Sequence, residues 1–184
     1  LLCLNYDGKF GLNNINSYFQ EANNASEAVS WQEWVFKEGD HILFNDTSRF
    51  PVLHNNLKGI IVKIEKQADR ISFTIDVSTI LTEINCKRHE IEFIDIIDDV
   101  TRIRFTVYAY DEQYESDEQL RMKSVIPFQL AYAVSIHKAQ GLEYDSVKVV
   151  IPSNNSEKIT HGIFYTAITR AKKKLKIYWS SETM

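Results

Sequence analysis

The sequence predicts an α/β domain with a parallel sheet that is interrupted by a small β-barrel. A strand–turn–helix pattern occupies residues 1–22, and an alternation of strands and helices returns from Phe128 onward. Between them, from Trp31, lie short runs of β-branched and aromatic residues separated by turn-forming residues. The 184 residues are 44% apolar and include 3 Trp, 9 Tyr and 10 Phe, which is enough to build a packed core.

The amino-terminal part of the predicted α/β domain consists of one strand and one helix. Leu1–Leu4 is a short apolar run that ends in the turn-forming segment Asn5–Gly8. Apolar residues then recur at helical spacing and predict an amphipathic helix over residues 12–22, namely Leu12, Ile15, Phe19 and Ala22. The polar residues 23–30 are predicted to form a linker. Because the chain begins directly with a core-type strand, we expect it to be a fragment.

The predicted barrel spans residues 31–99, and the α/β domain comprises residues 1–30 and 100–184. The strands of the barrel are expected at residues 34–44, 59–65, 70–76 and 90–97. The segment 98–127 leaves two alternatives open, because a strand at Arg102–Tyr110 fits either the barrel or the parallel sheet. The acidic residues 111–119 after it predict a solvated loop.

The carboxyl-terminal part carries polar residues where a buried chain would carry apolar ones. The pattern predicts a strand ending at Ser135, a helical turn to Gln140, a strand over 146–151, a helix over about 159–171 and a strand over 175–179. One face of the helix is apolar and forms the core face: Ile163, Phe164, Ala167, Ile168 and Ala171. The opposite face carries Tyr165, Thr166, Thr169 and Arg170.

Charge and composition exclude several classes of protein. The net charge of −4 excludes a protein that coats nucleic acid by bulk electrostatics, so contacts with DNA require local clusters. Cys3 and Cys86 are expected to be free core thiols in a reducing cytoplasm. No apolar run is long enough to span a membrane, and no signal peptide is evident. The sequence also contains no Gly-x-x-x-x-Gly-Lys-[Ser/Thr] loop, which cradles nucleotide phosphates.

Two segments of the chain resemble helicase motifs. Ala131–Asp145, with Ser-Ile-His-Lys-Ala-Gln-Gly at its centre, resembles motif V of superfamily 1 helicases, and Tyr165–Ala171 resembles motif VI in its RecD-like version. The strand, turn and helix at the amino terminus resemble the motif IV region, with Gly8, Gly11, Asn16 and Gln20 as counterparts. The resemblance implies the second RecA-like domain of a P-loop NTPase-type motor, with ATP bound between two such domains and 5′-to-3′ travel on single-stranded DNA.

The resemblance also implies a role for each matched residue. Arg170 corresponds to the arginine that reaches the γ-phosphate of ATP and is the expected catalytic residue, because a guanidinium binds phosphate bidentately and stays charged. Gly141 and Glu143 join it as expected ATP-binding residues, the carboxylate accepting hydrogen bonds from the ribose. The expected DNA-binding residues are Ser135, His137, Lys138, Gln140 and Thr166. Ala139 departs from the pattern, since RecD-like relatives usually carry Ser there.

The middle of the chain resembles the SH3-like insert of RecD-type helicases. Phe36-Lys-Glu-Gly-Asp40 and Asn55-Asn-Leu-Lys-Gly59 resemble its F-x-x-G-D and N-G-x-x-G signatures, although the usual Asp of the second is missing. Trp31 and Trp34 are expected to be buried at the barrel junction. The run Lys172–Lys176 is interpreted as the end of a helix, where the helix dipole stabilises positive charge, rather than as a nucleic-acid-binding patch.

The sequence is also compatible with other proteins. Pif-type helicases share this form of motif V, and a relaxase–helicase fusion would carry the same motor. A non-catalytic nucleic-acid-binding module would make Arg170 dispensable. A metal nuclease would need a carboxylate cluster, for which Asp95, Asp98 and Asp99 are the only candidates.

The helicase hypothesis names further components. It implies ATP and Mg²⁺, with the Mg²⁺ ligands in a missing amino-terminal half, and no metal site in this chain. The implied partners are single-stranded DNA, the first RecA-like domain of the same polypeptide, and nuclease or helicase subunits. We expect a cytoplasmic protein without a membrane segment.

Overall fold

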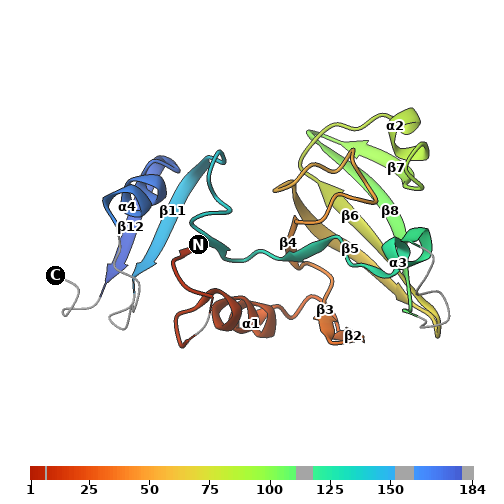
Figure 1. Ribbon diagram of the computed structural model, residues 1–184, viewed down its shortest axis with the longest axis horizontal. Coiled ribbons are helices and arrows are strands. Elements are labelled where there is room, and N and C mark those ends of the chain that lie inside the picture. Colours follow the sequence, from red (N-terminus) through yellow and green to blue (C-terminus); the bar gives the residue numbers. More distant parts are fainter. Residues whose placement is uncertain (7, 111–117, 152–159, 180–184) are drawn as a thin grey trace. The chain divides into compact units, whose positions relative to one another are not determined.

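The computed structural model describes residues 1–6, 8–110, 118–151 and 160–179. The chain divides into two compact units (Figure 1). The parallel unit comprises Leu1–Ala22 and Ala131–Met184, and the antiparallel unit comprises Asn23–Leu130. Because the second unit lies within the sequence of the first, the first is built from both ends of the chain.

The parallel unit contains a four-stranded sheet in the order β10-β1-β11-β12. The strands are β1 (Leu2–Cys3), β10 (Val134–Ser135), β11 (Tyr144–Ile151) and β12 (Ala171–Trp179). All three pairings are parallel, with Leu2 beside both Val134 and Val149. The prediction that Leu1–Leu4 enters the same sheet as residues 146–151 is confirmed, as is the mixed α/β class with a parallel sheet.

Two helices belong to this unit, and each differs in detail from its prediction. Helix α1 (Leu12–Ala22) buries Leu12, Asn16 and Gln20, whereas Phe19, predicted on its core face, is 42% exposed. Helix α4 (His161–Ile168) ends earlier than the predicted residue 171. The start predicted at about residue 159 lies outside the described residues.

Strand β12 begins at Ala171, four residues before the predicted strand. Its register with β11 runs from Tyr144–Ala171 to Ile151–Trp179, so inter-strand hydrogen bonding overrides the helix propensity of the Ala-Lys-Lys-Lys segment. The interpretation of Lys172–Lys176 as a helix end is therefore wrong, because these lysines lie in a strand.

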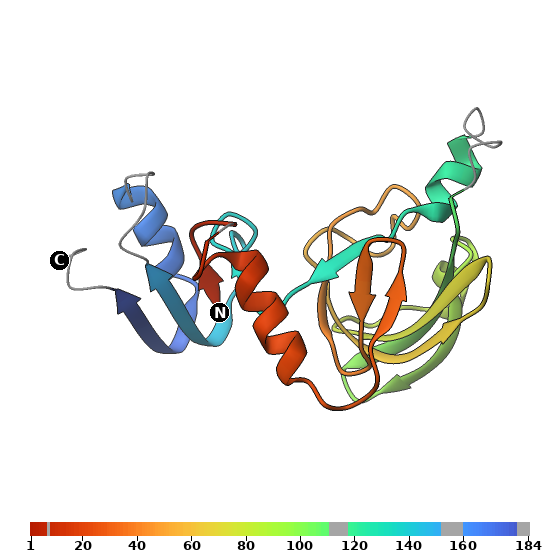
Figure 2. The ribbon, with the colours of Figure 1, turned by 90° about the horizontal axis from the view of Figure 1, so that it is seen from below.

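The antiparallel unit is a six-stranded sheet in the order β7-β8-β6-β5-β4-β9. Its strands are β4 (His41–Phe44), β5 (Lys58–Lys66), β6 (Arg70–Val77), β7 (Glu92–Ile97), β8 (Val100–Tyr108) and β9 (Phe128–Leu130). The hairpin of β2 (Val29–Trp31) and β3 (Trp34–Phe36) lies beside this sheet (Figure 2). Two short helices, α2 (Glu83–Lys87) and α3 (Glu118–Ser124), complete the unit.

Alternating side chains of these strands form one aromatic core. On β6, Ile71, Phe73, Ile75 and Val77 are each 0% exposed, as expected for a sheet with one buried face. Phe73 packs edge-on against Phe36 and Phe128 with ring centroids 5.2 and 5.1 Å apart. Burying each such ring stabilises the unit by roughly 1.5–3 kcal/mol.

The F-x-x-G-D segment has a structural role in this unit. Phe36 lies in the core, and Gly39 adopts a left-handed backbone with φ of 85°. The Asp40 carboxylate is fully buried and accepts hydrogen bonds from the backbone N–H of Lys37 at 2.8 Å and from Asn23 Nδ2 at 3.1 Å. The signature thus fixes the turn between β3 and β4.

Several predictions for this region differ from the structure. Strand β8 pairs with β6 over eight residues, so the segment from residue 100 lies in this sheet, and the unit spans residues 23–130 rather than 31–99. Within the described residues β7 and β9 are edge strands that do not pair with each other, so the closed SH3-like barrel is not confirmed. Trp31 is buried, but Trp34 is 47% exposed, contrary to prediction. Of the loop predicted over residues 111–119, residues 111–117 lie outside the described residues, and Glu118 and Gln119 belong to α3 instead.

Cys3 and Cys86 are both free and buried, as predicted. Each unit contains one of these two cysteines, so neither unit can form an internal disulfide bond. Burial raises the pKa of the Cys3 thiol to about 11 and also raises the pKa of Cys86. Both thiols are therefore poor nucleophiles.

Candidate functional site

Arg170 lies in the short connection between α4 and β12, where it contacts two segments of the chain. Its Nε donates to the carbonyl oxygen of Thr166 at 3.0 Å, and its Nη1 donates to the carbonyl oxygen of Leu142 at 3.3 Å. Its Nη2 donates to the hydroxyl of Thr169 at 3.0 Å. Among the described residues, no carboxylate lies within ion-pair distance of the guanidinium. Arg170 is thus held in place while its charge stays available to an anion.

The segment Ser135–Gln140, here called the serine loop, begins at the carboxyl end of β10. Ser135 is 2% exposed, and its hydroxyl accepts hydrogen bonds from the Lys138 backbone N–H at 3.2 Å and from the Tyr6 hydroxyl at 3.5 Å. The Ala139 N–H donates to the Ser135 carbonyl at 3.0 Å, closing one helical turn. Ser135 therefore orders the turn rather than presenting its hydroxyl to solvent.

The remaining residues of the serine loop differ in exposure. His137 and Gln140 are exposed, and Lys138 is half-buried. Ala139 is 0% exposed, so its methyl group is enclosed within the loop. Gly141 follows with φ of 83°, a left-handed conformation that favours glycine where the chain turns towards β11.

Charged residues line the amino ends of β11 and β12. Glu143 pairs with Lys172 at 3.0 Å, and Asp145 pairs with Lys173 at 2.8 Å. The Glu143 carboxylate raises the pKa of Lys172 through a hydrogen bond and its charge. All four side chains are mostly exposed, so each pair contributes little stability. Glu143 can exchange its lysine for another hydrogen-bond donor.

The predicted site residues extend from one edge of the sheet to the other, because the chain after β10 leads back to the start of β11. Because β10, β11 and β12 are parallel, Ser135 marks the carboxyl edge, whereas Glu143 and Arg170 lie just before β11 and β12 at the amino edge. The Tyr144 N–H donates to the Arg170 carbonyl at 2.9 Å, which joins the two segments at the amino edge.

Thr166 lies with the amino-edge group and not with the serine loop. Its hydroxyl donates to the Gly162 carbonyl of its own helix at 2.8 Å, and its carbonyl accepts from Arg170. The sequence placed it among the DNA-binding residues, but the structure does not bring it together with Ser135 and His137.

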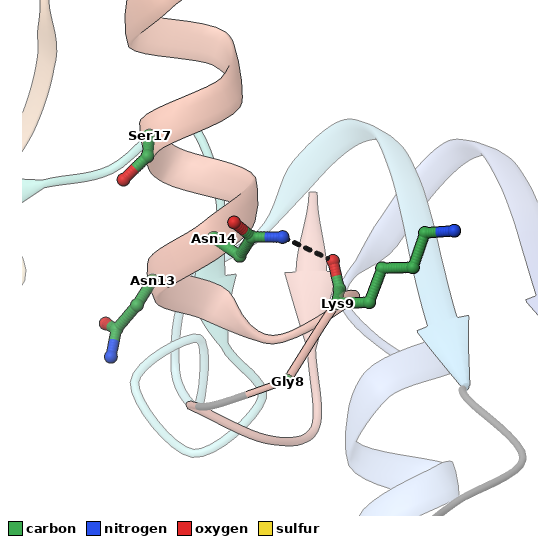
Figure 3. A pocket seen from close by; sticks show the side chains of 5 residues that line it. All are labelled: Gly8, Lys9, Asn13, Asn14 and Ser17. Atoms are coloured by element: carbon green, nitrogen blue, oxygen red, sulfur yellow. Dashed lines mark hydrogen bonds between the residues drawn. The ribbon is translucent and has the colours of Figure 1, made fainter.

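The carboxyl edge also carries a polar pocket after β1 (Figure 3). Its volume is about 510 Å³, and it is lined by Gly8, Lys9, Asn13, Asn14 and Ser17 at the start of α1. Asn14 Nδ2 donates to the Lys9 carbonyl at 2.9 Å. Tyr6, in the segment that leads to this pocket, contacts Ser135 of the neighbouring strand.

A contact between α1 and the start of β10 was not predicted. Asn16 is buried and forms two hydrogen bonds with Ala133: its Nδ2 donates to the carbonyl at 3.2 Å, and its Oδ1 accepts from the N–H at 2.8 Å. The side-chain amide thus mimics a strand beside Ala133. The available signal was the pair Asn16 and Gln20, two amides one turn apart in line with the apolar Leu12.

Metal ligands are not grouped in the part of the chain that the structure describes. No cluster of three or more His, Cys, Asp or Glu side chains occurs there, and Asp95, Asp98 and Asp99 form none. None of the described helices has the length and apolar character needed to cross a membrane.

Comparisons with known proteins agree on one group. Residues 130–178 match the UvrD-like helicase C-terminal domain. The RecBCD enzyme subunit RecD of Mycolicibacterium smegmatis is 46% identical over 46 residues, covering 25% of this chain and 8% of that protein. The RecD subunit of Buchnera aphidicola subsp. Acyrthosiphon pisum is 22% identical over 183 residues, covering 97% of this chain and 24% of that protein.

The fold is also similar to that of a solved helicase. The crystal structure of Bacteroides Pif1 bound to ssDNA superposes with a TM-score of 0.53 at 14% identity, covering 96% of this chain and 39% of that one. The chain thus spans about a quarter or less of the RecD proteins named above. Together these similarities confirm that the chain resembles the carboxyl-terminal part of RecD-like superfamily 1 helicases.

Proposed function

We propose that this chain is the second motor domain of an ATP-dependent DNA helicase, with the antiparallel unit as an SH3-like insert. The observation that carries the proposal is Arg170, a half-buried guanidinium that is fixed by three hydrogen bonds and has no carboxylate partner among the described residues. An arginine held in this way matches the requirement for binding a phosphoryl group that develops charge during transfer.

The amino edge of the sheet is the proposed nucleotide side. Arg170 contacts the γ-phosphate of ATP bound between this domain and a first RecA-like domain of the same polypeptide, where an arginine finger accelerates hydrolysis by about 10³–10⁵-fold. Glu143 leaves Lys172 and accepts the ribose hydroxyls, and Gly141 lets the backbone approach the nucleotide. The Mg²⁺ ligands are proposed to belong to the first RecA-like domain of the intact protein.

The serine loop, which leaves the carboxyl edge and leads back to the start of β11, is the proposed DNA side. Single-stranded DNA is contacted directly by His137, Lys138 and Gln140. Ser135 supports this contact indirectly, because its hydroxyl caps the turn that holds them. Thr166 is not assigned to the DNA side. Its carbonyl accepts a hydrogen bond from Arg170, so it belongs to the nucleotide side. The polar pocket of α1 extends the DNA side along the carboxyl edge.

The connection from Gly141 to Tyr144 links the two sides. It follows the serine loop directly and holds Arg170 through the Leu142 carbonyl and the Tyr144 N–H. A shift of the serine loop on DNA is therefore transmitted to Arg170 through consecutive residues. This continuity supports coupling of hydrolysis to stepwise movement on single-stranded DNA.

We further propose that the intact protein binds the same kinds of partner as RecD-like helicases. They are single-stranded DNA and nuclease or helicase subunits of a RecBCD-type assembly, with 5′-to-3′ travel. The proposal is tested by DNA-stimulated ATP hydrolysis and duplex unwinding by the intact protein. Both activities are expected, whereas the isolated chain is expected to hydrolyse no ATP. Binding of DNA without any hydrolysis by the intact protein would instead identify a non-catalytic binding module.

A further inference from the structure

Strands β11 and β12 present a second surface that the proposed motor function does not use. Alternate residues of a strand point to opposite faces of its sheet. Val147, Val149 and Ile151 of β11 are buried on one face. The other face carries three register pairs, Ser146–Lys174, Lys148–Lys176 and Val150–Tyr178.

Helix α1 covers only part of this face. Leu12 and Ile15 of the helix pack against Cys3 on β1, and Cys3 is the register partner of Val150. Beyond Val150 the side chains of Lys148, Lys174 and Lys176 are exposed, and Tyr178 is 43% exposed. These four residues are here called the lysine face.

Among the described residues, no carboxylate pairs with the ammonium groups of the lysine face. No Asp or Glu occupies the six positions of the register pairs. Lys172 and Lys173 of the same run pair with Glu143 and Asp145, but the lysine face has no ion pair among the described residues. Lys148 and Lys176 are direct cross-strand neighbours, and like charges in that position destabilise a sheet. In a chain of net charge −4, this local cluster favours a polyanion.

An aromatic ring is part of the same surface. Lys176 Nζ lies 4.8 Å from the centroid of the Tyr178 ring. Proteins bind single-stranded nucleic acid without sequence preference through two kinds of group. Positive charges follow the phosphate backbone, and exposed aromatic rings stack on the bases. The lysines stand about 4.8 Å apart across the strands and about 6.6 Å apart along β12, which suits successive contacts along one backbone.

We infer that the lysine face is a second binding surface for single-stranded nucleic acid, separate from the serine loop. Lys148, Lys174 and Lys176 contact the phosphates, and Tyr178 stacks on an unpaired base. The inference does not depend on ATP hydrolysis or on Arg170, so the two can fail independently.

The test measures binding of a fluorescein-labelled oligothymidine to the intact, nucleotide-free protein over a range of salt concentrations. Each lysine–phosphate contact to a single strand contributes about 0.7 to the slope of log K against log salt. The double variant Lys148→Gln/Lys176→Gln should therefore lower the slope by about 1.4. The matched control Lys63→Gln/Lys66→Gln removes the same charge from the exposed lysines of β5 and should leave the slope unchanged.

Equal slopes for wild type and the Lys148/Lys176 variant would overturn the inference, as would equal losses in both double variants. Self-association of the Lys148/Lys176 variant with an unchanged slope would show instead that these lysines protect an edge strand from aggregation.

A second arm examines the ring. Tyr178→Ala should bind oligothymidine at least about fivefold more weakly with the slope unchanged, and Tyr178→Phe should bind as wild type, because stacking needs only the ring. Equal affinity of Tyr178→Ala and wild type would contradict stacking. If polyglutamate of matched length displaces the oligothymidine as well as unlabelled DNA does, the surface serves an acidic protein and the inference is wrong.

Discussion

The guanidinium of Arg170 donates a hydrogen bond to the main-chain carbonyl of Leu142 at 3.3 Å, which joins the motif VI segment to the connection after the serine loop. The Tyr144 N–H returns a hydrogen bond to the Arg170 carbonyl at 2.9 Å. The residue proposed to reach ATP is therefore positioned by the segment that continues from the residues proposed to contact DNA.

Ser135 and His137 should respond differently to removal of their side chains. Ser135→Ala removes the acceptor for the Lys138 N–H and should destabilise the turn by about 1 kcal/mol, by analogy with loss of a capping hydroxyl. His137 is exposed, so His137→Ala should leave stability unchanged. Both variants should weaken single-strand binding or its stimulation of ATP hydrolysis. Urea denaturation and oligonucleotide titration of the intact protein measure these effects, and wild-type DNA response in both variants would contradict the DNA side.

Asn16 should be important for stability although it is a polar residue in a helix. Asn16→Leu leaves the N–H and carbonyl of Ala133 without their partner in a buried site, and each unsatisfied group costs about 1–3 kcal/mol. Asn14→Leu on the same helix loses one exposed hydrogen bond and serves as the control. The midpoint of urea denaturation should fall clearly for the first variant and little for the second; equal shifts would show that the Ala133 contact contributes nothing.

Much of the parallel unit could be predicted from the sequence, because its signals are local. Leu1–Leu4 is an apolar run bounded by turn residues, and it pairs where it was expected. The extent of β12 was not predictable, since Ala171–Lys174 favours a helix and only pairing with β11 makes it a strand. The same holds for Asn16, whose partner Ala133 lies 117 residues away. The hydrogen bonds of Arg170 likewise depend on tertiary contacts that no spacing reveals.

The raised pKa of Cys3 should make the free energy of unfolding depend on pH in the alkaline range. The pKa of this thiol is about 11 in the folded chain and 9.0 for an unburied thiol, so the unfolded state loses the proton first as the pH rises. The stability contributed by the protonated thiol is therefore complete below pH 9 and is lost as the pH approaches about 11. Cys3→Ala should reduce the difference in urea midpoint between pH 8 and pH 10.5, and an undiminished difference would show that other groups cause it.

Reactivity provides a second measurement of the same thiol. At pH 8 the peptide containing Cys3 should remain unmodified by iodoacetamide in the native protein and react fully in urea, as followed by mass spectrometry. Rapid native modification would place the thiol at the surface, in conflict with its exposure of 0%.

Arg170 is proposed to act on the nucleotide and not on DNA. The most direct test of this role is the ATPase rate and the single-strand affinity of the intact protein carrying Arg170→Ala, with Arg70→Ala, an exposed arginine of β6, as the control. We predict a loss of ATPase activity of about 10³-fold or more, in the range of other arginine fingers, with single-strand affinity unchanged. Arg170→Lys should rescue little, because a compact ammonium group lacks the planar fork whose separate nitrogens reach Thr166, Leu142 and Thr169. Near-normal ATPase activity of Arg170→Ala, or a loss of DNA binding that equals the loss of hydrolysis, would contradict the account.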